Sequence, residues 1–320
     1  MPAFRIDSAD CRPRLTETGR LDPGSDELEI RISACGLNFA DLLMIKGTYQ
    51  DTPELPFTLG MEVAGTVERV GTQVTGFAEG DRIAVFGGQG GLAEYGCFFA
   101  DRAVKLPKSM PFEDAAAFQI AYGTSHVALD HKARLKKGET LLVLGAAGGV
   151  GLTAVEIGKL MGATVVACAR GSEKLEIAKA AGADHLIDAK TDDIREVCQS
   201  LGGLDVVYDP VGGDQFKSAF RACKPEARIL TIGFASGEVP KIPANHLLVK
   251  NIDVMGLYWG GYLAFRPQVI TQSLATLIKW YEARRISPHI GAIYPLEQAQ
   301  DGLDLLASRK STGKVVIKID

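Results

Sequence analysis

The chain has 320 residues and a formal net charge of −4, with 46% hydrophobic and 23% charged residues. This balance is ordinary for a globular protein, and the length is enough for two domains of roughly 150 residues each. The acidic balance and the lack of any block of Lys and Arg argue against a nucleic-acid partner. No apolar run reaches the roughly 18 residues of a membrane span, and the early charges do not fit a secretory signal. We therefore expect a cytoplasmic protein without a membrane partner.

Short strands dominate the first hundred or so residues. The run ELEIRISACGL at residues 27–37 alternates apolar and polar residues, as a half-buried strand does. Gly71, Gly76 and Gly80 then punctuate a run with strand-turn-strand character. This pattern predicts an all-β or barrel-like domain.

From about Pro111 the pattern becomes helical, and apolar strands then alternate with helices. ETLLVLG at 139–145 is a buried strand, GVGLTAVEIGKLMG at 149–162 a helix, and TVVACA at 164–169 the next strand. Such an alternation predicts a parallel, doubly wound sheet with helices on both faces. The last strand, GKVVIKI at 313–319, must pair somewhere, and we expect it to return to the N-terminal β domain.

The strand and helix at 139–162 are joined by the loop in VLGAAGGVG, residues 143–151. A glycine-rich turn before a helix presents unpaired N–H groups at the positive helix end, where a pyrophosphate fits. Gly148 would let phosphate approach the backbone, and Gly151 would let the helix pack on its strand. The dinucleotide frame G-x-G-x-x-G places Ala146 where the first glycine is usual. The simpler interpretation is a tight turn with no ligand. The predicted cofactor-binding residues here are Ala146, Ala147, Gly148, Gly149, Val150 and Gly151.

The end of the second strand indicates which dinucleotide is bound. An NAD site usually has an acidic residue there, about 20 residues along, but this chain has Arg170. Arg170, Ser172 and Lys174 would instead hold a 2′-phosphate, so we predict NADPH as the cofactor. The alternative is that Glu173 and Lys174 form only the solvated first turn of a helix.

Several segments carry a family resemblance. They are GLNFADLLMIKGTY, LGMEVAGTVERVG, GDRIAVF, AYGTSHVAL, VLGAAGGVGLTAVEIGKLMGATVVA, DVVYDPVGG and GKVVIKI, in that order. On these the chain resembles, over essentially its whole length, the zinc-independent quinone oxidoreductases of the medium-chain dehydrogenase/reductase superfamily, which include zeta-crystallin. The family's AAGGVG form of the loop accounts for Ala146.

The resemblance implies an α/β protein with two domains. A GroES-like β-barrel catalytic domain would comprise residues 1–118 and 262–320, and would therefore be discontinuous. A doubly wound Rossmann domain that binds NADP(H) would comprise residues 119–261, with the active-site cleft at the junction. A homodimer is also implied, formed by edge-to-edge extension of the Rossmann sheet near Asn251–Tyr258.

Zinc-dependent relatives differ from this chain at their metal ligands. Where they have a cysteine this chain has Asn38, and their Gly-His-Glu reads Gly60-Met61-Glu62. An amide and a thioether cannot replace the thiolate and imidazole that a catalytic zinc needs. We therefore expect no metal site, and a structural role for Glu62, with a polar role in the cleft as the alternative. The six cysteines are widely spaced and are expected to be free thiols.

In similar enzymes Asn38 and Thr124 would face the nicotinamide or its ribose. Tyr49 would donate a proton to the acceptor, or would only line the cleft. Phe234 and Lys314 correspond to positions near the cofactor. Some relatives contact the adenosine phosphate with a tyrosine where this chain has Ala189, and the neighbouring Lys190 would compensate for that loss.

The leading hypothesis is an NADPH-dependent oxidoreductase that passes hydride or electrons to quinones or related α,β-unsaturated carbonyls. Hydride transfer to such acceptors needs mainly orientation and exclusion of water. One alternative is an enoyl-thioester (2-enoyl-CoA) reductase, in which Tyr49 would be essential. The other is a non-catalytic NADPH-binding protein with a structural or regulatory role.

Overall fold

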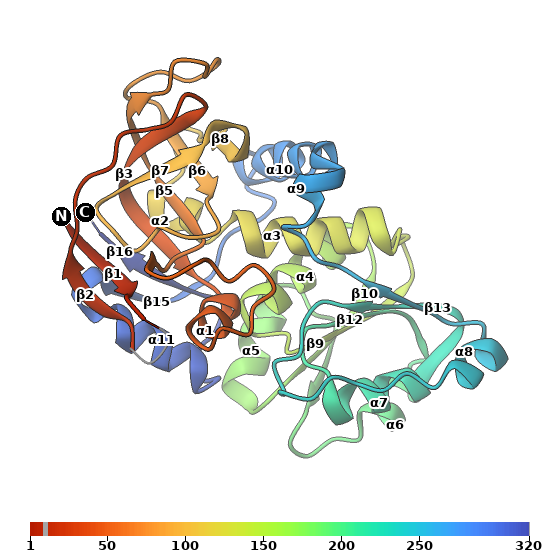
Figure 1. The fold of residues 1–320 in the computed structure, drawn as a ribbon. Coiled ribbons are helices and arrows are strands. Elements are labelled where there is room, and N and C mark those ends of the chain that lie inside the picture. Colours follow the sequence, from red (N-terminus) through yellow and green to blue (C-terminus); the bar gives the residue numbers. More distant parts are fainter. Residues whose placement is uncertain (9–11, 320) are drawn as a thin grey trace. The chain divides into compact units, whose positions relative to one another are not determined.

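The computed structural model describes residues 1–8 and 12–319 (Figure 1). It separates into two compact units. Unit 1 comprises Met1–Ile120 together with Pro288–Asp320, and unit 2 comprises Ala121–Ser287. The chain therefore leaves unit 1 once, forms all of unit 2, and then returns to unit 1.

Unit 1 is built on antiparallel sheets. A seven-stranded sheet has the order β15-β16-β3-β5-β6-β8, with β7 pairing to β3, and a smaller sheet has the order β2-β1-β4. The strands are β1 (Pro2–Ile6), β2 (Arg14–Glu17), β3 (Glu27–Leu37), β4 (Phe57–Thr58), β5 (Glu62–Val70), β6 (Arg82–Phe86), β7 (Tyr95–Phe99), β8 (Ala103–Lys105), β15 (Ile290–Pro295) and β16 (Lys314–Lys318). The helices are α1 (Phe39–Ile45), η1 (Ala100–Arg102), α2 (Phe112–Ala116), η3 (Leu296–Gln298) and α11 (Ala299–Ala307).

The last strand, β16, completes the large sheet of unit 1. It pairs antiparallel with β3, with Val315 opposite Leu37 and Ile317 opposite Cys35. Val315, Val316 and Ile317 are buried, so pairing satisfies the backbone and also removes an apolar strand from water. The prediction that the terminal strand returns to the N-terminal β domain is confirmed.

Unit 2 has a six-stranded parallel sheet in the order β11-β10-β9-β12-β13-β14. Its strands are β9 (Thr140–Leu144), β10 (Thr164–Ala169), β11 (His185–Asp188), β12 (Leu204–Asp209), β13 (Cys223–Thr231) and β14 (Asp253–Gly256). Its helices are η2 (Val127–Lys132), α4 (Gly149–Leu160), α5 (Ser172–Ala180), α6 (Ile194–Ser200), α7 (Gly213–Ala222), α8 (Ala244–Lys250), α9 (Tyr262–Phe265) and α10 (Pro267–Glu282). Helix α3 (Gln119–His126) starts in unit 1 and continues into unit 2.

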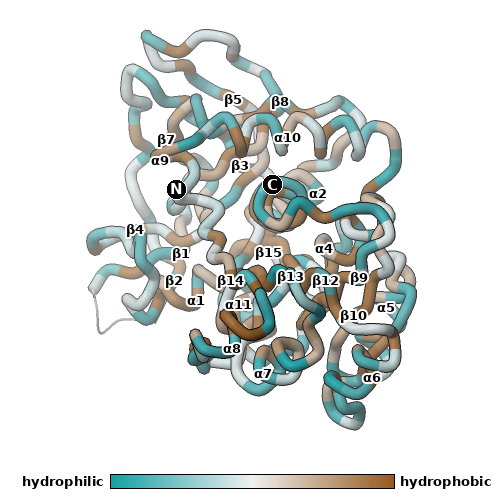
Figure 2. Tube along the Cα trace, turned by 90° about the vertical axis from the view of Figure 1, so that its right-hand side faces the viewer, coloured by the Kyte–Doolittle hydropathy of each residue, from teal (hydrophilic) through white to brown (hydrophobic). Residues whose placement is uncertain are grey.

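The centre of this sheet is its hydrophobic core. Every residue of β9 is buried, and so is nearly every residue of β10 and β12. These strands appear among the brown segments of Figure 2. Burial on both faces explains the continuous apolar runs in the sequence. The strand order reverses between β9 and β12, so the loops that follow these two strands meet where doubly wound sheets bind nucleotides.

The second domain boundary lies later than predicted from the sequence. The chain returns to unit 1 at Pro288 rather than at residue 262, so α9 and α10 belong to unit 2. Helix α10 is held there by His126, whose Nδ1 lies 2.9 Å from Ser273 Oγ and whose ring meets Trp280 edge-on at 5.2 Å. These tertiary contacts, rather than a change in sequence pattern, set the boundary.

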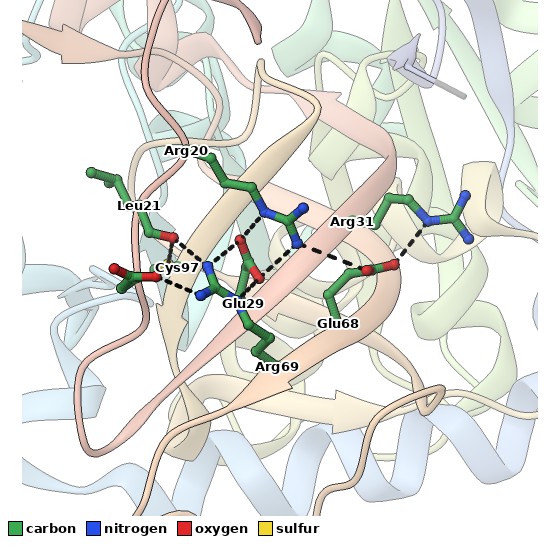
Figure 3. A network of polar contacts seen from close by, with 8 residues as sticks. Arg20, Leu21, Glu29, Arg31, Glu68, Arg69 and Cys97 are labelled. Atoms are coloured by element: carbon green, nitrogen blue, oxygen red, sulfur yellow. Dashed lines mark hydrogen bonds and ion pairs between the residues drawn. The ribbon is translucent and has the colours of Figure 1, made fainter.

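A network of charged side chains fastens the segment before β3 to the sheet of unit 1 (Figure 3). Glu29 is almost fully buried and accepts hydrogen bonds from Arg20 and Arg69, at 2.9 Å for each Nη2. Arg69 also donates to the carbonyl of Leu21 at 2.8 Å. Burial by itself would raise the pKa of Glu29, but the bonds from Arg69 and Arg20 outweigh it and lower the pKa to about 2.

The described cysteines are free thiols, as expected; Cys11 lies outside the described residues. Burial raises the pKa of both Cys168 and Cys198 to about 12, which keeps these thiols protonated and unreactive. Among the described helices, none combines the length and the hydropathy that crossing a membrane requires.

Candidate cofactor-binding and active-site residues

The glycine loop follows β9 and leads directly into α4. Gly148 is the N-cap of this helix in extended conformation, and no side chain caps the helix there. The N–H groups of Gly149, Val150 and Gly151, the first residues of α4, therefore have no partner within the helix. These donors, at the positive end of a 12-residue helix, are suited to a phosphate group.

The turn itself explains why an alanine is tolerated at position 146. The left-handed residue of the loop is Gly145, with φ +60°, one position before the usual first glycine. Ala146 is fully buried, and its N–H donates to the carbonyl of Cys168 at 3.0 Å. Ala146 thus continues the hydrogen bonding between β9 and β10, and its N–H is not available to a ligand.

The other two glycines of the frame differ in what surrounds them. A Cβ at Gly151 would lie 2.2 Å from the carbonyl oxygen of Gly145, so this glycine is required for the helix to pack on the turn. A Cβ at Gly148 would meet only that same oxygen, at 3.4 Å, which is an ordinary contact. Internal packing therefore does not demand glycine at 148.

Basic side chains gather after β10. Arg170 and Ser172 are exposed, and Lys174 is half-buried in the first turn of α5. Burial lowers the pKa of Lys174, and the nearby charge of Arg170 lowers it further. The Nζ of Lys190 lies 3.8 Å from where a Cβ on Gly171 would stand. Arg170, Lys174 and Lys190 thus form a group that we call the basic cluster, and an anion would relieve its mutual repulsion.

The loop after β12 packs against the glycine loop. Val211 Cγ2 lies 3.0 Å from where a Cβ on Gly145 would stand, and Asp209 holds this second loop by accepting from the N–H groups of Val211 and Gly212, both at 2.8 Å. Phe234, after β13, lies beside Gly212 and is 37% exposed. Phe234 therefore lies at the same strand ends as the glycine loop.

Thr124 lies in α3 and is almost fully buried. The next residue, Ser125, is hydrogen-bonded to Val150 O at 2.9 Å, Thr153 Oγ1 at 2.7 Å and the buried Tyr208 hydroxyl at 3.0 Å. These bonds fix the helix that carries Thr124 against the helix that begins at the glycine loop. The sequence interpretation missed Ser125, Thr153 and Tyr208, because each reads there as an ordinary small or aromatic core residue.

In unit 1 the predicted residues Asn38 and Lys314 are in direct contact. Lys314 Nζ donates to Asn38 Oδ1 at 2.7 Å and forms an ion pair with Glu62 Oε1. Asn38 Nδ2 donates to Glu62 Oε1 at 3.0 Å and to the carbonyl of Gly36 at 3.2 Å. Lys314 and Glu62 are 5% and 1% exposed. The prediction that Glu62 is structural agrees with its position at the centre of this group.

Tyr49 follows α1 and is half-buried. Its carbonyl accepts from the N–H of Thr52 at 3.1 Å and from the Thr52 hydroxyl at 2.7 Å, which fixes the backbone of this turn. At the other end of α1, the buried carboxylate of Asp41 accepts from the N–H of Asn38 at 2.7 Å. Helix α1 therefore connects two of the predicted catalytic residues.

Comparison with known proteins agrees with both units. The model of the alcohol dehydrogenase GroES-like domain matches residues 24–108, and that of the zinc-binding dehydrogenases matches residues 149–280. A quinone oxidoreductase-like protein 2 homolog of Nematostella vectensis is 40% identical over 92% of this chain and 82% of its own length. The chain belongs to the quinone oxidoreductase family of medium-chain dehydrogenases and reductases. The predicted fold, a GroES-like domain with a Rossmann domain, is confirmed.

A solved structure and a further relative carry different kinds of name. The crystal structure of Escherichia coli quinone oxidoreductase complexed with NADPH superposes with a TM-score of 0.90 at 28% identity, covering 99% of both chains. The human synaptic vesicle membrane protein VAT-1 homolog is 33% identical over 92% of this chain and 79% of its own length. Names within the family thus range from enzymes to a vesicle protein, so the substrate must be argued from the site.

The match to zinc-binding dehydrogenases raises the question of whether a zinc ion fits. Asn38 stands where the resemblance places a cysteine ligand, and its amide is bonded to Lys314 and Glu62. Met61 offers only a thioether in place of imidazole. The remaining carboxylate, Glu62, is paired with an ammonium group. These residues do not fit a catalytic zinc, because the donors are either poor ligands or already bound.

Proposed function

We propose that this chain is an NADPH-dependent reductase of quinones and related α,β-unsaturated carbonyls that works without zinc. One observation carries the proposal. Asn38 and Glu62, at two of the zinc-ligand positions, form a closed group with the ammonium of Lys314. Reduction of an isolated carbonyl benefits from a Lewis acid, whereas a conjugated acceptor spreads the negative charge over its own atoms.

The cofactor part of the proposal rests on unit 2. The free N–H groups at the start of α4 would bind the pyrophosphate. The basic cluster would bind the 2′-phosphate that distinguishes NADPH from NADH. The E. coli enzyme complexed with NADPH, which has the same fold, supports this assignment.

The chemistry needs a hydride, a proton and a means of holding both reactants. When bound, NADPH supplies the hydride, and a quinone that accepts it together with one proton becomes a hydroquinone. Tyr49 would donate that proton from its hydroxyl and recover it from solvent. Asn38 and Thr124 would orient the nicotinamide and the acceptor. This orientation of the two reactants would supply most of the rate enhancement. Transfer in one-electron steps is an alternative route for quinones.

The direct test is consumption of NADPH in the presence of ortho-quinones and of enones, followed by absorbance. We expect turnover with at least one class and a strong preference for NADPH over NADH. Tight binding of NADPH without turnover on a broad panel of acceptors would contradict the proposal. That result would favour a non-catalytic structural or regulatory role.

The second candidate is an enoyl-thioester reductase, which is favoured by Tyr49 in a half-buried position after α1. Such a reaction leaves a carbanion that must be protonated, so the phenol would be essential. Tyr49→Phe separates the two candidates. A large loss with enoyl thioesters and little loss with quinones would assign the thioester reaction. A large loss with both substrates would support Tyr49 as the proton donor for quinones as well, and a small loss with both would assign Tyr49 to the cleft wall.

A further inference from the structure

The group formed by Asn38, Glu62 and Lys314, which we call the amide clamp, is assembled by the register of three neighbouring strands. Gly36 is paired with Glu62 across β3 and β5, and Val315 is paired with Leu37 across β16 and β3. Asn38 directly follows Leu37, the last residue of β3, and Lys314 is the first residue of β16, directly before Val315. A Cβ at Gly36 would lie 2.0 Å from the carbonyl oxygen of Ala116. Only glycine therefore fits at this position of β3.

The amide clamp allows only one orientation of the Asn38 side chain. A carboxylate can only accept hydrogen bonds, and an ammonium group can only donate them. Nδ2 must therefore face Glu62 and Oδ1 must face Lys314, as observed at 3.0 and 2.7 Å. Rotation of the amide by half a turn would place oxygen against carboxylate and N–H against ammonium, and both contacts would be repulsive.

This orientation limits what Asn38 can do for a ligand. Both N–H bonds of Nδ2 are used inside the protein, by Glu62 and by the carbonyl of Gly36. The only capacity left is the second lone pair of Oδ1. Asn38 can therefore accept a hydrogen bond from a hydroxyl or amide group, but it cannot donate one to the carbonyl of an acceptor.

We infer that Lys314 is a positioning residue that, with Glu62, fixes Asn38 as a hydrogen-bond acceptor toward the bound cofactor or the reduced product. Its ammonium group is buried and bonded to Asn38 and Glu62, so it acts through Asn38. This assignment replaces the expectation that Lys314 binds the cofactor directly. This inference rests on the proposed function only for the identity of the ligand that Asn38 contacts.

The inference is tested by exchanging the charges within the clamp of the full-length protein. Asn38→Asp alone places two carboxylates together and should lower kcat/KM for NADPH-dependent quinone reduction by about a hundredfold. Adding Glu62→Gln restores the net charge and places an N–H donor opposite Asp. The kcat/KM of the double variant should therefore be at least about tenfold higher than that of Asn38→Asp alone, because a carboxylate at position 38 also accepts hydrogen bonds.

Lys314 is tested in the same assay. Lys314→Met removes the donor and should lower kcat/KM by about tenfold, and Lys314→Arg should recover part of that loss, because a guanidinium also donates. Each variant is first checked for a cooperative thermal transition. No recovery in the Asn38→Asp, Glu62→Gln double variant, despite a wild-type-like transition, would overturn the inference, because the ligand would then need the N–H of Asn38.

A second measurement keeps this test separate from that of the proposed function. The proposed function fails if the wild type oxidises no NADPH with any acceptor. The clamp is then judged by fluorescence titration with NADPH and by the stability of the same variants. We expect Glu62→Gln to offset part of the stability lost in Lys314→Met, because it removes the unpaired buried charge. Purely additive losses in stability would overturn the inference.

Discussion

At the scale of single residues, Gly148 and Gly151, the two glycines of the dinucleotide frame, have separable roles. Gly151→Ala would force a Cβ to within 2.2 Å of a backbone oxygen, so we expect a loss of about 3 kcal/mol in the free energy of unfolding. Gly148→Ala meets nothing closer than 3.4 Å and should leave stability nearly unchanged. It should nevertheless weaken NADPH binding by about tenfold or more, since the Cβ would stand where we propose that the phosphate binds.

Thermal unfolding and NADPH titration of the two alanine variants check this prediction, each variant serving as the control for the other. Equal loss of stability in both, or unchanged NADPH affinity in Gly148→Ala, would show that the loop is only a tight turn.

The basic cluster makes a prediction about cofactor choice. Lys190→Ala should weaken NADPH binding by about tenfold and leave NADH binding unchanged, because only NADPH carries the 2′-phosphate. Lys179→Ala is the matched control, since Lys179 is an exposed lysine in the last turn of α5, the helix whose first turn carries Lys174 of the basic cluster. Competition titrations at low and moderate salt measure both affinities. An equal effect of the two substitutions on NADPH affinity would show that Lys190 does not bind the 2′-phosphate.

At the scale of secondary-structure elements, the strands and helices of unit 2 could be predicted, because strands that are buried on both faces are continuous apolar runs in the sequence. β9 is the apolar run at 140–144, and α4 begins at the glycine loop as expected. The end of unit 2 could not be predicted in this way, because α10 is held by contacts of His126 with Ser273 and Trp280. Those contacts join residues far apart in the chain.

The candidate site shows the same division. The glycine loop and the basic residues after β10 are local patterns that a sequence displays directly. The amide clamp is not local, because Lys314 and Asn38 are 276 positions apart. The resemblance indicated that both matter, but only the register of β16, β3 and β5 shows that they act on each other.

The ionic network around Glu29 predicts how stability depends on pH. Its pKa falls from 4.5 to about 2 on folding, so the folded state holds the charged form more strongly than the unfolded state. The resulting stabilisation is fully present above about pH 4.5 and is lost as the pH falls through about 2. Because both arginine partners are partly exposed, we expect the contribution to be roughly 1–3 kcal/mol.

Glu29→Gln should therefore lower the free energy of unfolding by that amount at neutral pH and by much less near pH 2. Denaturant titrations at several pH values measure this difference. Glu17→Gln is the control, because the Glu17 side chain is 82% exposed and its ion pair should contribute little. A Glu29→Gln effect independent of pH would contradict the assigned cause.

At the scale of the whole molecule, the edge of the unit 2 sheet favours assembly. β14 is the last strand of that sheet, and the neighbouring helix α8 has no buried residue. Leu248 and Val249 on this helix are 79% and 74% exposed. An unpaired strand edge beside exposed apolar side chains is a typical association surface. We therefore propose the homodimer implied by the family resemblance, formed through β14.

Substitution of both Leu248 and Val249 by Asp should convert the dimer to a monomer, because charges would have to be buried at the interface. Sedimentation or light scattering measures the mass. Ile293→Asp is the control, since Ile293 is 51% exposed on β15, the edge strand of the unit 1 sheet. A monomeric wild type would contradict the proposed dimer, and loss of the dimer in the control would move the interface to unit 1.

The central claim is that this family member reduces conjugated acceptors with NADPH and needs no zinc, because Lys314 and Glu62 already engage the amide of Asn38. The most direct measurement is the rate of NADPH-dependent quinone reduction by protein that has been dialysed against a strong chelator and analysed for zinc. We predict an unchanged rate with no zinc bound. Loss of activity on chelation, with recovery when zinc is restored, would contradict the account.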